Sequence, residues 1–202
     1  MPGFDTKGEP KDYTVGALVQ ANYGKKHHFR IAGIPVGRIL AQEEAKAAEQ
    51  DEEKKRALEK LEREKERKDG SIIVILATDA PLHPTQLQRL ARRATVGLAR
   101  AGGHGHNPSG DIFLAFSTGT SVPVQSISMT RREVDPFKPT PFTTDLVDDS
   151  SINGLFEAAA EATEEAIYNA VCMAETMIGH QGNKIEALPL ERVKDIFDKF
   201  SI

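Results

Sequence analysis

Gly70 and Ser71 stand immediately before the longest purely apolar run in the sequence, residues 72–77. A serine hydroxyl can attack a preceding glycine carbonyl, because glycine lacks a Cβ and lets other groups approach closely. The attack moves the acyl group from nitrogen to oxygen, and hydrolysis of the ester leaves Ser71 as a new N-terminus. Its α-amino group, with a pKa of about 7.7–8.0, could then serve as general base for its own hydroxyl. The alternative is a simple linker end before a core strand.

Three more polar residues could take part in such chemistry. Ser109 and Asp111 lie two positions apart at the entrance to an apolar stretch, 112–118, and could face one site if the chain turns at Gly110. Asn22 lies between two predicted strands. Asparagine is common in turns because it tolerates left-handed dihedrals and bonds its own backbone. Composition alone therefore favours a turn at Asn22.

The segments around these residues resemble the L-aminopeptidase/D-esterase family of self-cleaving N-terminal-serine hydrolases, which includes the β-peptidyl aminopeptidases. The matching segments, in the family's order, are YTVGALVQANYG (13–24), RIAGIPVG (30–37), GSIIVILATDAPL (70–82), QLQRLARRATVGLAR (86–100), SGDIFLAFST (109–118) and NAVCMAETMIG (169–179). The family normally carries a much longer segment before the cleavage site. We therefore expect residues 1–40 to be a remnant of the N-terminal, α-subunit-like segment.

The resemblance implies a role for each candidate residue. Ser71 is expected to be the nucleophile after cleavage of the Gly70–Ser71 bond, with its freed amine as the base. Asn22 would donate its side-chain amide to the oxyanion, and Ser109 with Asp111 would orient the nucleophile and relay protons. The β-peptide-cleaving branch tends to carry Glu where this sequence has Asp111, which leaves the substrate preference open. No metal or organic cofactor is implied.

The function expected from this resemblance is release of N-terminal residues from small peptides, amides or esters by a homo-oligomer. One alternative is a truncated, catalytically inactive relative that acts through assembly or a protein partner. A second alternative is an acyltransferase with related self-processing, but that group uses threonine where this chain has Ser71.

The elements that must position these residues follow from hydrophobic periodicity and turn signals. The run after Ser71 predicts a strand buried on both faces. A capping box at Thr85 and Gln88 predicts the start of a helix that ends at Gly102-Gly103. The other predicted elements are strands at 13–21, 28–36, 112–118 and 122–130, an extended stretch at 136–142, a helix from the Asp148–Ser151 cap to Ile178, and a helix at Leu190–Phe200. Cys172 and Met173 are expected in the packed core of the long helix.

Residues 41–70 are predicted to be a charged helical linker that ends at the cleavage site. Nearly every residue from 41 to 68 is Glu, Lys, Arg, Gln or Ala, and Leu58 and Leu61 are too few for a core-facing stripe. Residues 71–202 are expected to form the β-subunit-like catalytic portion, and the three parts together one domain. The fold class is α+β, and the resemblance implies a four-layer αββα sandwich, incomplete at the N-terminus.

The composition limits the classes of binding partner and the cellular compartment that we expect for the protein. The net charge is −4 and the basic residues form no stripe, which argues against nucleic acid. A single cysteine excludes an internal disulfide framework, and no segment resembles a signal peptide or a membrane span, so we expect a cytoplasmic protein without a membrane partner. His104 and His106 supply only part of a zinc site, and His27-His28 is expected to be isolated, so no metal is predicted.

Overall fold

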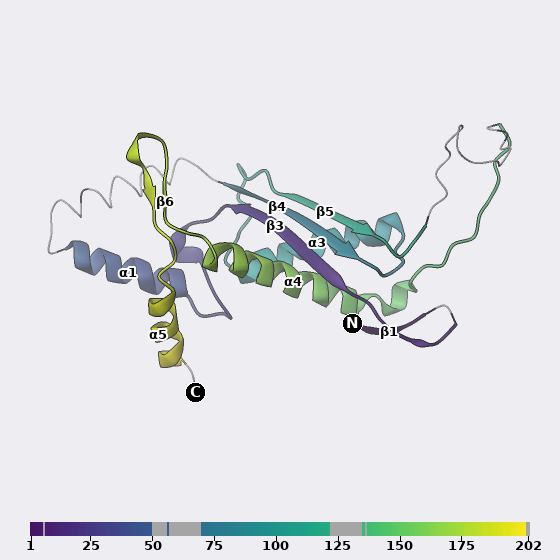
Figure 1. Ribbon diagram of the computed structural model, residues 1–202, viewed down its shortest axis with the longest axis horizontal. Helices are drawn as coiled ribbons and strands as arrows, with labels where there is room; N and C mark the ends of the chain where they lie inside the picture. Colours follow the sequence, from purple (N-terminus) through teal and green to yellow (C-terminus); the bar gives the residue numbers. More distant parts are fainter. Residues whose placement is uncertain (6, 50–55, 57–69, 122–134, 136, 201–202) are drawn as a thin grey trace.

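The protein is built around a three-stranded sheet in the order β3-β4-β5 (Figure 1). The computed structural model describes residues 1–5, 7–49, 56, 70–121, 135 and 137–200. The strands are β3 (Val15–Asn22), β4 (Ser71–Thr78) and β5 (Ile112–Ser117). β4 pairs antiparallel with β3 and parallel with β5. Parallel neighbours need a crossover connection, which helix α3 (Pro84–Arg100) supplies.

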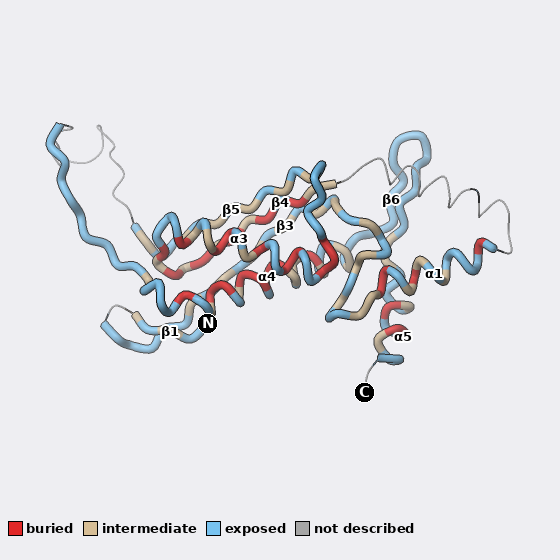
Figure 2. Tube along the Cα trace, turned by 180° about the vertical axis from the view of Figure 1, so that it is seen from behind, coloured by how far each residue is buried: buried red, intermediate tan, exposed pale blue. Residues whose placement is uncertain are grey.

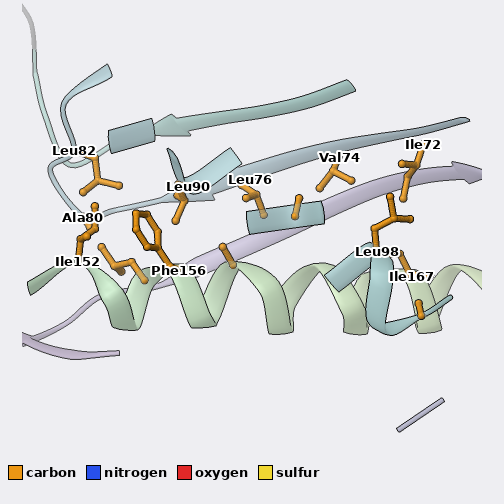
Figure 3. Packing of buried hydrophobic residues seen from close by; sticks show 14 residues of the cluster. Ile72, Val74, Leu76, Ala80, Leu82, Leu90, Leu98, Ile152, Phe156 and Ile167 are labelled. Carbon is orange, nitrogen blue, oxygen red and sulfur yellow. The ribbon is translucent and has the colours of Figure 1, made fainter. Parts of the chain in front are cut away.

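Helices α3 and α4 (Asn153–Cys172) pack on one face of this sheet, and the main core lies between these helices and the sheet. Ile72, Val74 and Leu76 of β4 point into it and are fully buried. Figure 3 shows these side chains meeting those of the helices, and Figure 2 shows the buried positions of α3 and α4 along the same layer. The helical side of the core consists of Leu90, Ala94, Leu98, Ile152, Leu155, Phe156, Ala159 and Ile167.

The opposite face of the sheet is apolar and exposed. Leu18 on β3, Ile73 on β4 and Leu114 on β5 are 69%, 39% and 54% exposed. The prediction that β4 is buried on both faces is therefore wrong for this structure, because both helices that cover the sheet lie on the same side. β4 instead alternates between buried and more exposed positions, as a strand packed on one face does.

A second, smaller cluster joins helices α1 (Val36–Ala48) and α5 (Leu190–Phe200). Val36, Leu40, Val193 and Ile196 are its buried members. Arg192 of α5 also donates from Nε to Oε2 of Glu43 on α1 at 2.9 Å. The predicted terminal helix is thus confirmed, and it packs on this cluster through the buried Val193 and Ile196.

The predicted strand over residues 28–36 is wrong. The chain forms a short 3-10 helix, η1 (Lys26–His28), and α1 begins at Val36. Between them Ala32 and Gly33 adopt positive φ angles of 48° and 80°, and Ile31 pairs with Ile34 across this turn. An extended strand cannot pass through two such residues.

The long helix predicted to reach Ile178 ends at Cys172. Met173 is 77% exposed, so its predicted core position is wrong, and β6 (Met177–Ile178) pairs with β7 (Lys184–Ile185). Ala170 and Ala174 are exposed and offer little apolar area, so no packed face extends the helix. Cys172 itself is half-buried, and desolvation raises the pKa of its thiol, which keeps it protonated and unreactive.

The N-cap of helix α3 lies two residues before the predicted cap, Thr85. His83 is the N-cap residue: its Nδ1 accepts from the Thr85 amide at 3.2 Å, and its own amide donates to Gln86 Oε1 at 2.9 Å. Pro84 at the first helical position needs no hydrogen-bond partner for its nitrogen. The remaining short elements are β1 (Pro2–Phe4), β2 (Pro10–Asp12), η2 (Asp149–Ser151) and η3 (His180–Gly182).

The predicted charged helix is confirmed over residues 41–48, which belong to α1. The rest of that segment, apart from residues 49, 56 and 70, and the predicted strand at 122–130 lie outside the described residues. The exposed stretch 137–142 has no helix or strand, as predicted. None of the helices in the described part of the chain is long and apolar enough to cross a membrane.

Gly97→Ala is expected to destabilise the fold. A Cβ at Gly97 would lie 2.4 Å from the Ala160 carbonyl oxygen and 2.8 Å from the Glu164 nitrogen, so α3 and α4 would have to separate. Alanine gains about 1 kcal/mol of helix propensity, but overpacking costs about 1–3 kcal/mol, and backbone atoms cannot move aside as a flexible side chain can. Thermal unfolding should show a melting temperature lower by several degrees.

The matched control is Gly154→Ala, also in a helix, where the new Cβ would meet mainly the flexible end of the Met1 side chain. This variant should keep the melting temperature or raise it. Equal melting temperatures for the two alanine variants would show that the close contact between α3 and α4 tolerates a methyl group.

Candidate active site

Strand pairing places Ser71 and Asn22 opposite each other. Ser71 is the first residue of β4, Asn22 is the last residue of β3, and the two are cross-strand partners. The left-handed residue of the following turn is Gly24, with a φ angle of 84°, and not Asn22. The turn interpretation of Asn22 is therefore wrong. Its side chain is exposed and makes no hydrogen bond to any other described residue, so its amide is available to a substrate.

Only glycine fits at position 70. A Cβ there would lie 1.4 Å from the carbonyl oxygen of Asn22 and 3.0 Å from the Cα of Tyr23. The φ angle of Gly70 is not positive, so the requirement comes from the close approach of another backbone segment rather than from strained dihedrals. This contact fixes the Gly70–Ser71 bond against the end of β3.

Ser109, Gly110 and Asp111 surround that bond from the entrance of β5. Ser109 Oγ lies 3.2 Å from the Gly70 carbonyl oxygen and 2.6 Å from Asp111 Oδ1. The Gly110 amide donates to Ser71 Oγ at 2.9 Å, and the Ile72 amide donates to Asp111 Oδ1 at 3.0 Å. The structure thus brings the four candidate residues to one end of the sheet.

The single hydroxyl hydrogen of Ser109 has two acceptors within reach. The bond to the Asp111 carboxylate is the shorter one, as charge-assisted hydrogen bonds are. The alternative acceptor is the carbonyl oxygen of the bond that the sequence predicts to break. Ser109 can therefore shift its hydrogen toward Gly70 when negative charge develops on that oxygen.

A pocket opens beside these residues, and the sequence did not identify most of its lining. It is lined by Tyr23, Gly24, Lys25, His28, Gly70, Leu98, Gly102, His104, Gly105, His106, Ser109 and Asp111. Burial, together with the charge of Asp111, raises the pKa of Tyr23 to about 12, so its hydroxyl stays protonated at neutral pH. Tyr23 directly follows Asn22 in the sequence, and this adjacency could have indicated that Tyr23 lies at the site.

The histidines at this pocket are not isolated, contrary to prediction. The ring of His28 lies 4.1 Å from that of His27 and 4.6 Å from that of His104, and the His104 and His106 rings stack at 5.5 Å. Desolvation lowers the pKa of His28, and the neighbouring His27, His104, His106 and Lys25 lower it further. Among the described residues, no group of three or more His, Cys, Asp or Glu has the arrangement of a metal site.

Comparison with known families identifies the chain. The family model described as peptidase family S58 matches residues 4–185. This chain belongs to peptidase family S58. A β-peptidyl aminopeptidase, BapA, from Sphingosinicella microcystinivorans is 39% identical over 193 residues. That alignment covers 94% of this chain and 44% of the relative, so this S58 chain spans less than half of that relative's length.

Solved structures agree with the family assignment. The β-aminopeptidase of a Burkholderia species matches with a TM-score of 0.70 at 38% identity, covering 94% of this chain and 45% of that one. The L-aminopeptidase D-Ala-esterase/amidase of Ochrobactrum anthropi matches with a TM-score of 0.69 at 35% identity, covering 98% and 46%. The latter is described as a prototype for the serine aminopeptidases and a variant of the Ntn hydrolase fold. The predicted resemblance and the mixed α/β class are thus confirmed.

Proposed function

We propose that this S58 chain is a self-processing N-terminal-serine aminopeptidase that releases N-terminal residues from small peptides, amides or esters. The observation that carries the proposal is the set of hydrogen bonds on the Gly70–Ser71 bond. The carbonyl oxygen of Gly70 faces a hydroxyl donor on Ser109, and the nucleophilic oxygen of Ser71 accepts from the Gly110 amide. Family membership supports peptidase chemistry at this site.

In the self-cleavage step, Ser71 Oγ attacks the carbonyl carbon of Gly70. The C–N bond breaks, an ester bond to Oγ forms, and the hydroxyl proton ends on the departing nitrogen of Ser71. Ser109 stabilises the negative charge that develops on the Gly70 oxygen. Water then hydrolyses the ester, which leaves a carboxylate on Gly70 and a free hydroxyl and amine on Ser71.

Turnover repeats the same attack on a substrate carbonyl. The α-amine of Ser71 takes the hydroxyl proton and returns it to the leaving amine of the substrate. Water then releases the acyl group from Ser71 Oγ. Asp111 holds Ser109 through the 2.6 Å hydrogen bond and also accepts from the Ile72 amide, so it fixes the start of β4 during the reaction.

The Asn22 amide would stabilise the oxyanion formed during turnover. Its position opposite Ser71 in the β3–β4 pairing supports this role, and so does the absence of a hydrogen bond to another described side chain. A donor that is not engaged elsewhere can meet the developing charge without first breaking a bond.

The proposal also extends to architecture, assembly and compartment. A second sheet over the exposed apolar face of β3, β4 and β5, covered in turn by a second layer of helices, would complete a four-layer αββα sandwich. The apolar side chains on that face support this arrangement. We further propose a homo-oligomer and a cytoplasmic location.

The direct test is the intact mass of the purified protein under denaturing conditions. Cleavage between Gly70 and Ser71 without added protease should give chains 1–70 and 71–202, with the larger chain beginning at Ser71. A single uncut chain after prolonged incubation at neutral pH would contradict self-processing and would favour an inactive relative that acts through assembly or a partner. Hydrolysis of an aminoacyl p-nitroanilide by the cut protein would then establish turnover.

A further inference from the structure

The pocket is lined by Gly70 and Asp111 of the candidate site, although not by Ser71 itself. His28, His104 and His106, whose ring centroids lie 4.6–6.3 Å apart, form an imidazole wall in this lining, which also includes Lys25. Two loops carry them, and backbone packing holds the loops together. A Cβ at Gly102 would lie 2.0 Å from the His28 carbonyl oxygen, and the Arg30 amide donates to the Ala101 oxygen at 3.3 Å. These contacts fix the backbone next to the imidazole wall, in which His28 is half-buried and His104 and His106 are exposed.

The position of the pocket indicates which part of a substrate it would receive. Gly70 is one of its lining residues, and Gly70 is the acyl side of the bond that breaks in the proposed self-cleavage. After the piece that ends at Gly70 leaves, the N-terminal residue of a substrate presents its carbonyl carbon to Ser71 Oγ from the Gly70 side. The inference therefore rests on the proposed function and concerns the residue that the enzyme releases.

The charges of the lining differ between its two sides. Asp111 supplies the negative charge, and its Oδ2 has no hydrogen-bond partner among the described residues, so it can meet the ammonium group of a substrate. Lys25 and the imidazole wall line the same pocket and can supply hydrogen-bond donors to a ligand. A carboxylate placed against this wall would relieve the repulsion that His27, His104, His106 and Lys25 exert on protonated His28.

We propose that the imidazole wall binds a carboxylate on the substrate's N-terminal residue, so that this enzyme prefers acidic N-terminal residues over neutral ones of the same shape. An acidic N-terminal residue carries an ammonium group and a carboxylate, which matches the two sides of the pocket. A carboxylate could also lie on the leaving group of the substrate. The pocket, however, adjoins Gly70, which is on the acyl side of the scissile bond, and the leaving group is on the opposite side.

The experiment compares kcat/KM for L-aspartyl p-nitroanilide and L-asparaginyl p-nitroanilide, which differ in charge and hardly in shape. The wild-type protein should prefer the aspartyl compound by about tenfold, the effect of one hydrogen bond to a charged group. In the double variant His104→Gln/His106→Gln this ratio should fall toward one. The matched control is His180→Gln, an exposed histidine in η3, which should keep the wild-type ratio.

Equal kcat/KM values for the two anilides in the wild-type protein would overturn this inference and leave the proposed aminopeptidase intact. A second pair, Ala-Ala and its C-terminal amide, tests the other source of a carboxylate. Suppose that the wild-type protein prefers Ala-Ala over its amide, loses this preference in the double variant, and shows no preference for the aspartyl compound. The carboxylate site would then receive the leaving group, and the inference would be overturned.

If the protein hydrolyses none of these compounds, the proposed function is contradicted, but a binding experiment can still test whether the imidazole wall binds a carboxylate. L-Aspartate should shift the ring C–H NMR signals of His28, His104 and His106, whereas L-asparagine should shift them far less. Identical shifts with both amino acids would overturn the inference without reference to activity.

Discussion

Ser71→Ala is expected to abolish cleavage at Gly70–Ser71 and turnover together, while the fold stays intact. The same hydroxyl carries out both reactions in the proposed mechanism, first on the Gly70 carbonyl and then on the substrate. Ser71 is only partly buried at the first position of β4, and among the described residues its Oγ accepts one hydrogen bond, from the exposed Gly110 amide. Water can replace that acceptor, so the melting temperature should hardly change.

Denaturing mass spectrometry and an aminoacyl p-nitroanilide assay check this prediction on the same sample. Ser71→Ala should remain one chain with background hydrolysis, and Ser71→Cys should be partly cut, because a thiol can make the same acyl shift. Ser121→Ala, at an exposed serine beyond β5, is the control and should be cut as the wild type is. A fully cut Ser71→Ala protein would mean that another group or a contaminating protease breaks the chain.

Asn22→Ala should lower kcat by about 10²–10³, the usual effect of removing one oxyanion donor. The effect on stability should be small, since the side chain is exposed and engages no other described side chain. The rate of self-cleavage should fall less than kcat does, because Ser109 rather than Asn22 contacts the Gly70 carbonyl oxygen. The two reactions can therefore be separated by one substitution.

The matched control for this prediction is Gln20→Ala. Gln20 lies on the same exposed side of β3, two residues before Asn22, and is paired with Ile73 instead of Ser71. It should keep wild-type kcat and melting temperature. Near-normal turnover in Asn22→Ala would remove the proposed oxyanion role, and an equal loss of kcat in both variants would indicate a general effect of altering β3.

The sequence allowed prediction of the features that local patterns determine. The strand after Gly70 has an unbroken apolar run, the helix that follows it and the terminal helix have clear helical periodicity, and each of the three is present. Ser109 and Asp111 could be placed at the site because they flank Gly110 at the start of a strand. Their hydrogen bonds to the Gly70–Ser71 region lie across the parallel β4–β5 pairing.

Features that depend on packing between distant segments could not be predicted. The pairing of Asn22 with Ser71 depends on the β3–β4 register across the whole charged segment. The meeting of His28 with His104 depends on how closely the Gly102 backbone approaches the η1 loop. Likewise, an apolar run such as 72–77 cannot reveal that its helices cover only one face.

The β3–β4 ladder has a consequence for the protein once the Gly70–Ser71 bond is broken. β3 belongs to the piece 1–70, and β4 with α3, β5 and α4 belongs to the piece 71–202. Eight cross-strand pairs then hold two separate polypeptides together, from Val15–Thr78 at one end of the ladder to Asn22–Ser71 at the other. The proposed self-cleavage would thereby convert a folding equilibrium within one molecule into an association between two, and by mass action dilution would favour their separation. The midpoint of thermal unfolding should consequently depend on protein concentration in the mature form and not in the uncut one.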